Sequence, residues 1–189
     1  MALPTAFLVV LVVLSCRSAC SLDCDLPQNY SLGNKRTMTH LRAMKRISTT
    51  FCWKDTSDFG LPQDVVEGNQ FQKEQVMSFI YEMTQNILSL FCTEDSSTAW
   101  EKTLRYKFCA SLSQQLKNLK ACLTQQVRVE EPSLTHEDSK LAVRDYFDRI
   151  SLYLKEKKYS LCAWEVVRTE MMGFLSFSVI LQEQLRNKE

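Results

Sequence analysis

The chain has 189 residues, of which 45% are hydrophobic and 24% charged, and its formal net charge is +1. This length indicates a single domain, and the composition is too apolar for intrinsic disorder. The near-zero net charge gives no bulk electrostatic reason to bind nucleic acid or an anionic membrane. The chain has only four glycines, which argues against a glycine-rich phosphate loop. It has eight cysteines, and the redox compartment decides whether they form disulfides.

The first two dozen residues have the pattern of a secretory signal peptide. Residues 6–14 form an unbroken apolar run, which suits a signal h-region. The run is shorter than the roughly 20 residues that span a bilayer. Small residues follow it, and cleavage after Ser21 places Ala19 and Ser21 at the small-residue positions, whereas cleavage before Cys24 leaves Asp23 last. We therefore expect a secreted protein with no membrane insertion and no nucleic-acid partner.

The cysteine pattern fits long-range cross-links in an oxidising compartment. Cys16 and Cys20 fall in the signal segment, and no C-x-x-C spacing occurs anywhere. Thioredoxin-like and zinc-ribbon sites are therefore excluded, while the pairing of the remaining cysteines stays open. The remaining cysteines are Cys24, Cys52, Cys92, Cys109, Cys122 and Cys162.

Helical periodicity dominates the rest of the chain. Five segments place apolar residues three or four positions apart, which is the spacing of one face of an α-helix. Thr98 with Glu101 forms a capping-box pattern, and Thr135 precedes acidic residues, so helix starts are expected at both places. No sustained alternation predicts a strand. The five segments are 38–47, 76–90, 104–123, 143–154 and 164–181.

The connections between these segments suggest how the helices are arranged. A long connection, 47–75, contains Gly60, Pro62 and Gly68, and a second long one, 124–134, contains Pro132. Long connections allow crossovers between parallel helices. The sequence therefore predicts an all-α, up-up-down-down bundle of five helices with a long crossover after the first.

No catalytic or metal-binding pattern is visible. His40 and His136 are far apart, and no serine lies in a Gly-x-Ser-x-Gly elbow, so we expect no enzyme activity, metal or cofactor. Asn29 begins an N-glycosylation sequon in a stretch expected to be a loop. In the last helical segment Met172 and Phe177 lie off the apolar stripe, so we expect them at the surface, where such side chains are typical of interfaces.

Several motifs resemble those of type I interferons, and specifically of the alpha branch, with the omega branch as the nearest alternative. The similarity covers nearly the whole chain. Its most specific part lies at 146–150 and 162–168, where the letters read YFDRI and CAWEVVR. The other similar stretches are 24–28 (CDLPQ), 58–63 (DFGLPQ), 68–73 (GNQFQK) and 95–100 (DSSTAW).

The resemblance implies a signal peptide over residues 1–23 and one helical cytokine domain over residues 24–189. It also implies two disulfides, Cys24–Cys122 and Cys52–Cys162. Cys92 and Cys109 remain, and we expect free thiols there rather than a bond between them. The expected protein is a monomer that can form covalent dimers through either thiol.

The resemblance further implies a cytokine that bridges both chains of the type I interferon receptor and triggers JAK-STAT antiviral and antiproliferative signalling. We call the two groups of implied contact residues the high-affinity set and the low-affinity set, after the receptor chain that each would bind. The high-affinity set is Trp53, Lys54, Asp55, Thr56, Arg168, Thr169, Met172 and Phe177. The low-affinity set is Leu88, Ser89, Thr93, Leu104, Cys109, Ser113 and Arg144.

Some residues depart from the family pattern. Thr56 stands where arginine is common, and Gly173 stands where basic residues are usual, while Trp53 replaces a typical leucine. Losing a hot-spot arginine can cost about 2 kcal/mol of binding. The alternative hypotheses are therefore a weak or species-restricted agonist, an antagonist of the same receptor, or another four-helix cytokine.

Overall fold

The computed structural model describes residues 26–66, 72–94, 96, 98–126 and 135–186. Cys24 and the signal segment lie outside these described residues. No strand occurs in the described part of the chain, which confirms the all-α prediction. The elements are α2 (Leu26–Ala43), η1 (Thr49–Asp55), η2 (Gln63–Val65), α3 (Lys73–Phe91), α4 (Lys102–Gln126), α5 (Thr135–Glu156) and α6 (Leu161–Arg186), where η marks a 3-10 helix.

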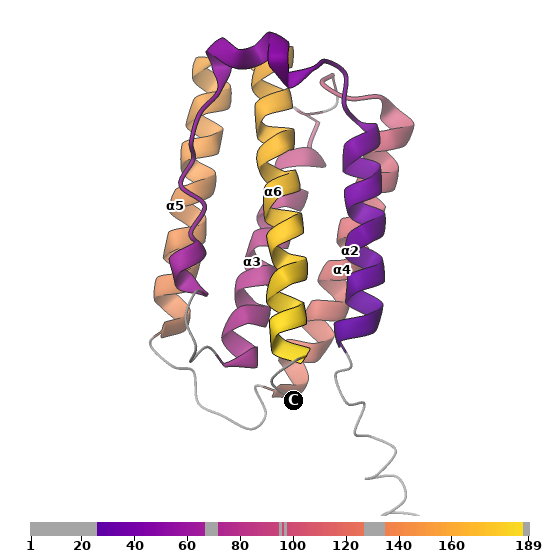
Figure 1. Ribbon diagram of the computed structural model, residues 1–189, viewed down its shortest axis with the longest axis vertical. Helices are drawn as coiled ribbons and strands as arrows, with labels where there is room; N and C mark the ends of the chain where they lie inside the picture. The colour runs from indigo at the N-terminus through magenta and orange to yellow at the C-terminus, as the bar shows by residue number, and fades with distance from the viewer. Residues whose placement is uncertain (1–25, 67–71, 95, 97, 127–134, 187–189) are drawn as a thin grey trace, which may run out of the picture.

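The helices pack as a bundle in which α2, α3 and α5 run one way and α4 and α6 run the other (Figure 1). α2 packs against α4 and α6, while α3 packs against α4, α5 and α6. The direction of α6 against α2 follows from two contacts, because Asn34 bonds to Ser178 whereas Leu41 bonds to Arg168. Helices α2, α3, α4 and α6 therefore follow the predicted up-up-down-down order, and α5 lies in the connection between the last two.

The long crossover after α2 passes over one end of the bundle. η1 lies across the ends of α6 and α5, and the segment after it descends along α5 (Figure 1). There the Phe59 ring packs edge-on against Tyr153, with 5.1 Å between ring centroids. One side of α5 is therefore covered by a segment without regular secondary structure. The backbone N–H and C=O groups of this segment need hydrogen-bond partners from other parts of the protein.

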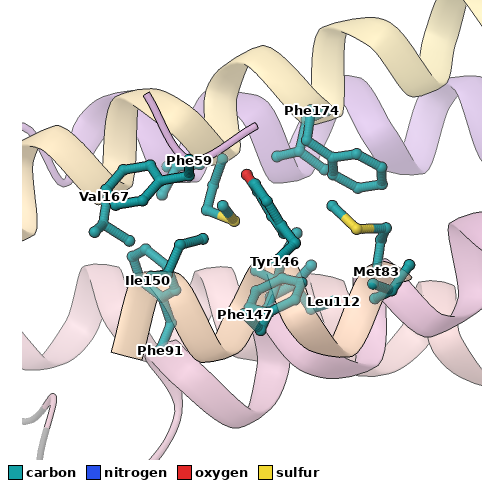
Figure 2. Packing of buried hydrophobic residues seen from close by; sticks show 14 of the residues in the cluster. Phe59, Met83, Phe91, Leu112, Tyr146, Phe147, Ile150, Val167 and Phe174 are labelled. Atoms are coloured by element: carbon teal, nitrogen blue, oxygen red, sulfur yellow. The ribbon is translucent and has the colours of Figure 1, made fainter. Parts of the chain in front are cut away.

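The core is formed by the apolar faces that the sequence periodicity predicts (Figure 2). Phe79, Met83 and Phe174 are fully buried where α3 meets α6. At the end of α3, Phe91 stacks on Trp100 at 5.8 Å and meets Trp164 edge-on at 5.8 Å. Aromatic pairs at such distances add to area burial, so this end of the bundle is firmly packed.

Two helix starts differ from the sequence prediction. Glu101 caps α4 itself, because its carboxylate accepts from the backbone N–H groups of Thr103 and Leu104 at 2.8 Å each. These bonds hold the pKa of Glu101 below its usual value. At the other end of the chain, α2 begins at Leu26, so Asn29 falls within a helix and the expected loop there is wrong. α5 begins at Thr135, as predicted.

Buried polar contacts fix α2 between its neighbours. The Asn34 amide donates to the Leu175 carbonyl oxygen at 3.0 Å and to the Ser178 hydroxyl at 2.7 Å, both on α6. On the other side, the Gln115 amide of α4 donates to the Thr37 hydroxyl at 3.0 Å. Because buried polar groups are costly without such partners, these bonds favour one register of α2 against both helices.

The disulfides agree with one expectation and correct another. Cys52 bonds to Cys162, 110 residues away, as the family resemblance implies. Cys92 bonds to Cys109, so the expectation of free thiols and of covalent dimers through them is wrong. The bond joins the end of α3 to the second turn of α4, two consecutive antiparallel helices. Cys122 is also disulfide-bonded, and its partner lies outside the described residues because the other four described cysteines pair with one another.

Candidate functional site

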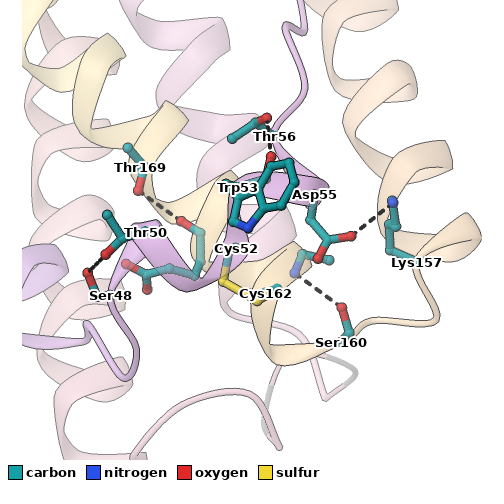
Figure 3. Close-up of a disulfide and its surroundings, with 12 residues drawn as sticks. Ser48, Thr50, Cys52, Trp53, Asp55, Thr56, Lys157, Ser160, Cys162 and Thr169 are labelled. Atoms are coloured by element: carbon teal, nitrogen blue, oxygen red, sulfur yellow. Dashed lines mark hydrogen bonds and ion pairs between the residues drawn. A yellow bond between two sulfur atoms is a disulfide. The ribbon is translucent and has the colours of Figure 1, made fainter.

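Trp53, Asp55, Thr56 and Thr169 of the high-affinity set lie where η1 crosses α6 (Figure 3), whereas Phe177 lies further along α6. η1 is fastened there by the buried Cys52, whose disulfide to Cys162 reaches the first turn of α6. Ser160 accepts the backbone N–H of Ala163 at 3.2 Å and so caps α6 beside this bond. The connection and the helix start are thereby held as one unit.

The η1 segment turns aromatic side chains outward on both sides of the buried cysteine. Trp53 is 66% exposed and Phe51 is 76% exposed. The Lys54 ammonium lies 5.2 Å from the centre of the Trp53 ring. Phe51 was not predicted from the sequence; its place next to Cys52 is a weak signal, because consecutive residues of a 3-10 helix point in different directions. Exposed aromatic side chains are enriched at protein interfaces, where tryptophan is a frequent hot-spot residue.

The turn after Trp53 is held by α5. The Thr56 hydroxyl donates to the Trp53 carbonyl oxygen at 2.8 Å, which closes the end of η1. The Tyr153 hydroxyl donates to the Asp55 carbonyl oxygen at 2.6 Å, and the Lys157 ammonium lies 2.9 Å from the Asp55 carboxylate. Burial, with the Asp55 charge as a second cause, raises the pKa of Tyr153 to about 12, so the hydroxyl remains a donor at neutral pH.

Arg168 lies inside the bundle rather than on its surface. It is only 6% exposed, and its guanidinium forms a forked pair with Glu165 at 2.9 and 2.6 Å. A third bond, at 3.3 Å, runs to the Leu41 carbonyl oxygen of α2. These contacts join α6 to α2 and leave little of Arg168 exposed, while its role as a receptor contact stays a prediction.

The remaining members of the high-affinity set on α6 have mixed exposure. Thr169 is exposed, and its hydroxyl donates back to the Glu165 carbonyl oxygen at 2.9 Å. Met172 and Phe177 are half-buried and pack against the core, so the expectation that they lie at the surface holds only for part of each side chain. The exposed part of the set therefore centres on η1 and Thr169.

The low-affinity set lies along α3 and α4, with Arg144 on α5. Ser89, Thr93 and Arg144 are exposed, and Arg144 lies 3.9 Å from Asp148 one turn along α5. Between α3 and α4, the Arg105 guanidinium donates to the Thr93 carbonyl oxygen at 2.9 Å. The half-buried members are Leu88, Leu104, Cys109 and Ser113.

The elements that carry most of the two sets lie on different sides of the bundle. In Figure 1, α6 lies in front of α3, and η1 crosses on the same front side as α6. α3 and α4 pack against each other behind them. A rigid bundle with exposed groups on two sides can contact two partners at once.

A part-buried hydrogen bond between α5 and α6 lies near the crossover. The Tyr146 hydroxyl donates to Glu170 Oε1 at 2.8 Å. Burial raises the pKa of both groups, and the negative charge of Asp58 raises them further. Across the described ranges, no cluster of three or more His, Cys, Asp or Glu residues could hold a metal ion. Nor does any described helix have the length and apolarity needed to cross a membrane.

Comparisons with known proteins agree with the helical fold. A family model of the interferon alpha/beta domain matches residues 26–185. Interferon alpha-17 of Homo sapiens is 58% identical over 189 residues, which is the full length of both chains. Interferon alpha-2 of Equus caballus is 56% identical over 183 residues, covering 97% of this chain and all of that protein. Among solved structures, zebrafish interferon 2 superposes with a TM-score of 0.69 at 27% identity, covering 80% of this chain and 97% of that one.

Proposed function

Because the chain belongs to the type I interferon family as an alpha-like member, we propose that it is a secreted ligand that joins the two chains of the type I interferon receptor. Members of this family are signalling cytokines, so the chain is not an enzyme. Joining the two receptor chains outside the cell brings their cytoplasmic kinases together, which starts JAK-STAT antiviral and antiproliferative signalling.

One structural observation supports this proposal most strongly: η1 and α6, which carry the high-affinity set, lie on a different side of the bundle from α3 and α4, which carry most of the low-affinity set. Once one receptor chain is bound, the second contact forms at the high effective concentration that the membrane surface imposes. Two contacts of modest strength therefore suffice, provided that their geometry is fixed. The packed core and the disulfides of the bundle supply this rigidity.

The proposal retains three expectations that rest on residues beyond the described ranges or on undescribed side chains. We propose that residues 1–23 are removed as a signal peptide and that Cys24 is the partner of Cys122. This bond would close a loop of about 100 residues, which stabilises a fold by about 4–5 kcal/mol in the chain-entropy model. We also keep Asn29 as a candidate glycosylation site, now within a helix, where the side chain must face solvent to be modified.

The test is a signalling assay with single-face variants. Refolded residues 24–189 are applied to receptor-bearing cells of several mammals, and an interferon-response reporter is read with and without a receptor-blocking antibody. Trp53→Ala should weaken binding to the immobilised high-affinity chain, whereas Arg144→Ala should leave that binding intact and lower the reporter signal. A folded wild-type protein that gives no signal in any of these cells would refute the agonist proposal.

The weak-agonist alternative has its own observation. Thr56 closes the η1 turn with a hydrogen bond to a backbone carbonyl instead of presenting a cation to a partner. Thr56→Arg should therefore increase affinity for the high-affinity chain if the alternative holds. Wild-type affinity equal to that of a potent alpha interferon would exclude it.

A further inference from the structure

Two further hydrogen bonds from α5 hold the crossover in the part that follows η1. Arg149 of α5 donates through Nε to the Phe59 carbonyl oxygen at 2.9 Å and through a terminal nitrogen to the Gly60 carbonyl oxygen at 3.2 Å. Gly60 has a φ of +62°, and its N–H donates to the Asp58 carboxylate at 2.9 Å. This tight turn directs two successive carbonyl oxygens at one guanidinium.

Together with Tyr153, Arg149 ties the backbone of the segment from Trp53 to Gly60 to α5, beside the buried Phe59 ring and the Lys157–Asp55 ion pair. A 3-10 helix has poorer hydrogen-bond geometry than an α-helix and rarely persists in long runs. The outward Trp53 ring contributes little packing of its own, since it is 66% exposed. The disulfide of Cys52 fastens the segment on the α6 side, and the two α5 side chains fasten it on the other side.

We propose that Tyr153 and Arg149 are positioning residues that pre-order the 53–60 segment for the high-affinity receptor chain. This inference rests on the proposed function and deepens it, because neither residue belongs to a contact set. Ordering a loop at the moment of binding costs affinity, so a loop that is ordered beforehand binds more tightly. The contact residues themselves then depend on two side chains that need not touch the receptor.

The test uses Tyr153→Phe, Arg149→Met and the double variant. Tyr153→Phe removes only the hydroxyl and keeps the ring that packs on Phe59, so the fold is retained. Hydrogen exchange of the 53–60 amides is measured in the free protein, and affinity is measured on the immobilised ectodomain of the high-affinity chain. Tyr153→Phe should speed exchange of these amides by about 3- to 10-fold, the effect of one lost hydrogen bond, and Arg149→Met, which loses two bonds, should speed it by at least as much. The double variant should approach the product of both effects and lose affinity by several-fold.

Tyr146→Phe is the matched control. It also removes a tyrosine hydroxyl from α5, but that hydroxyl bonds to Glu170 on α6 rather than to the crossover. It should leave exchange at 53–60 unchanged, so that an equal rise there would show a general loosening and overturn the inference.

Two further outcomes would also overturn it: unchanged exchange in the double variant, or faster exchange with wild-type affinity. The exchange measurement needs no receptor, so it judges the positioning of the segment by itself. Failure of the wild-type protein to bind either receptor chain would instead refute the proposed function, and the two failures are therefore distinguishable.

Discussion

The two proposed contact faces are built in different ways. The high-affinity face centres on η1, a 3-10 segment of seven residues that polar anchors and one disulfide hold against α5 and α6. The low-affinity face lies mainly on α3 and α4, regular helices of 19 and 25 residues, with Arg144 on α5. A helical surface takes its geometry from the core beneath it, whereas η1 depends on a few named bonds. Substitutions outside the contacts should therefore disturb the first face more than the second.

The largest expected effect comes from opening each disulfide. Replacing Cys52 and Cys162 by serine releases a loop with a sequence separation of 110, and replacing Cys92 and Cys109 releases one with a separation of 17. The chain-entropy model gives losses of about 4–5 and about 3 kcal/mol in the free energy of unfolding. Urea unfolding followed by circular dichroism measures both.

The same two variants sharpen the comparison of the faces. Loss of the Cys52 bond should also weaken binding to the high-affinity chain, because η1 loses its attachment to α6. Loss of the Cys92 bond should leave that binding near the wild-type value. Equal losses of binding in the two variants would contradict the view that the geometry of η1 depends more on individual bonds than that of the helical face does.

The buried pair of Arg168 and Glu165 should give the next largest effect. Arg168→Met leaves the Glu165 carboxylate, which is 1% exposed, without its partner, and this should cost about 3 kcal/mol of unfolding free energy. The double variant with both residues replaced by methionine should be less destabilised than either single one, because no unpaired buried charge remains. Thermal and urea unfolding of the three variants form the measurement. A small loss for Arg168→Met would indicate that the guanidinium is at the surface after all.

Much of the fold could be predicted from the sequence because burial and helix period are tightly linked. The stripes at 76–90, 143–154 and 164–181 all became buried faces, since apolar side chains three or four positions apart leave a helix one side to cover. The stripe at 38–47 overran its helix, because α2 ends at Ala43 and the crossover begins there. The spacing of apolar residues predicts which side of a helix is buried better than it predicts the residue at which the helix ends.

The site was harder to predict because it depends on partners distant in the sequence. The stripe of α6 does not reveal that Arg168 meets Glu165 and a carbonyl oxygen of α2, so its burial could not be predicted from the sequence. The bond between Cys92 and Cys109 requires the register of α3 against α4, which spacing alone does not fix. The roles of Tyr153 and Arg149 were missed for the same reason, because their partners are backbone carbonyl oxygens and carry no sequence signal.

Trp53→Ala separates contact from stability on the high-affinity face. The ring is 66% exposed, so the free energy of unfolding should change by no more than about 0.5 kcal/mol. Binding to the high-affinity chain should weaken by about 2 kcal/mol, roughly 30-fold, if the ring is a hot spot. Phe51→Ala is the comparison, since Phe51 is exposed nearby but belongs to neither set. Surface plasmon resonance gives both affinities, and an equal loss for Phe51 would extend the contact along η1.

A pair of glycine substitutions should give opposite changes in stability. Gly173 lies in the interior of α6, where an added Cβ meets nothing within 4 Å. Gly173→Ala should therefore stabilise the protein by about 0.5–1 kcal/mol through helix propensity. Gly60→Ala should destabilise it, because a φ of +62° is strained for a residue with a side chain. Thermal unfolding distinguishes the two, and destabilisation by Gly173→Ala would mean that this turn of α6 is not regular.

The smallest expected effect is on the pH dependence of stability, which should have opposite signs at Glu170 and at Glu101. Burial raises the pKa of Glu170 beneath the crossover. A carboxyl with a raised folded pKa contributes stability that is present at low pH and is lost as pH rises through that pKa. Glu170→Gln imitates the protonated form and still accepts from Tyr146, so it should match the wild type near pH 4 and become the more stable of the two near pH 7.

Glu101 at the start of α4 should behave in the opposite way. The backbone N–H groups of Thr103 and Leu104 lower its pKa, so its contribution is present above the unfolded pKa and is lost as pH falls through the folded pKa. Glu101→Gln should therefore be less stable than the wild type near pH 7 and converge with it in acid. Urea midpoints between pH 3 and pH 8 test both variants. The two variants should differ from the wild type with opposite pH dependence, because burial raises the pKa of Glu170 whereas the backbone N–H groups at the helix start lower that of Glu101. Parallel dependence would show that at least one of the two carboxylates has the same pKa in the folded and the unfolded chain.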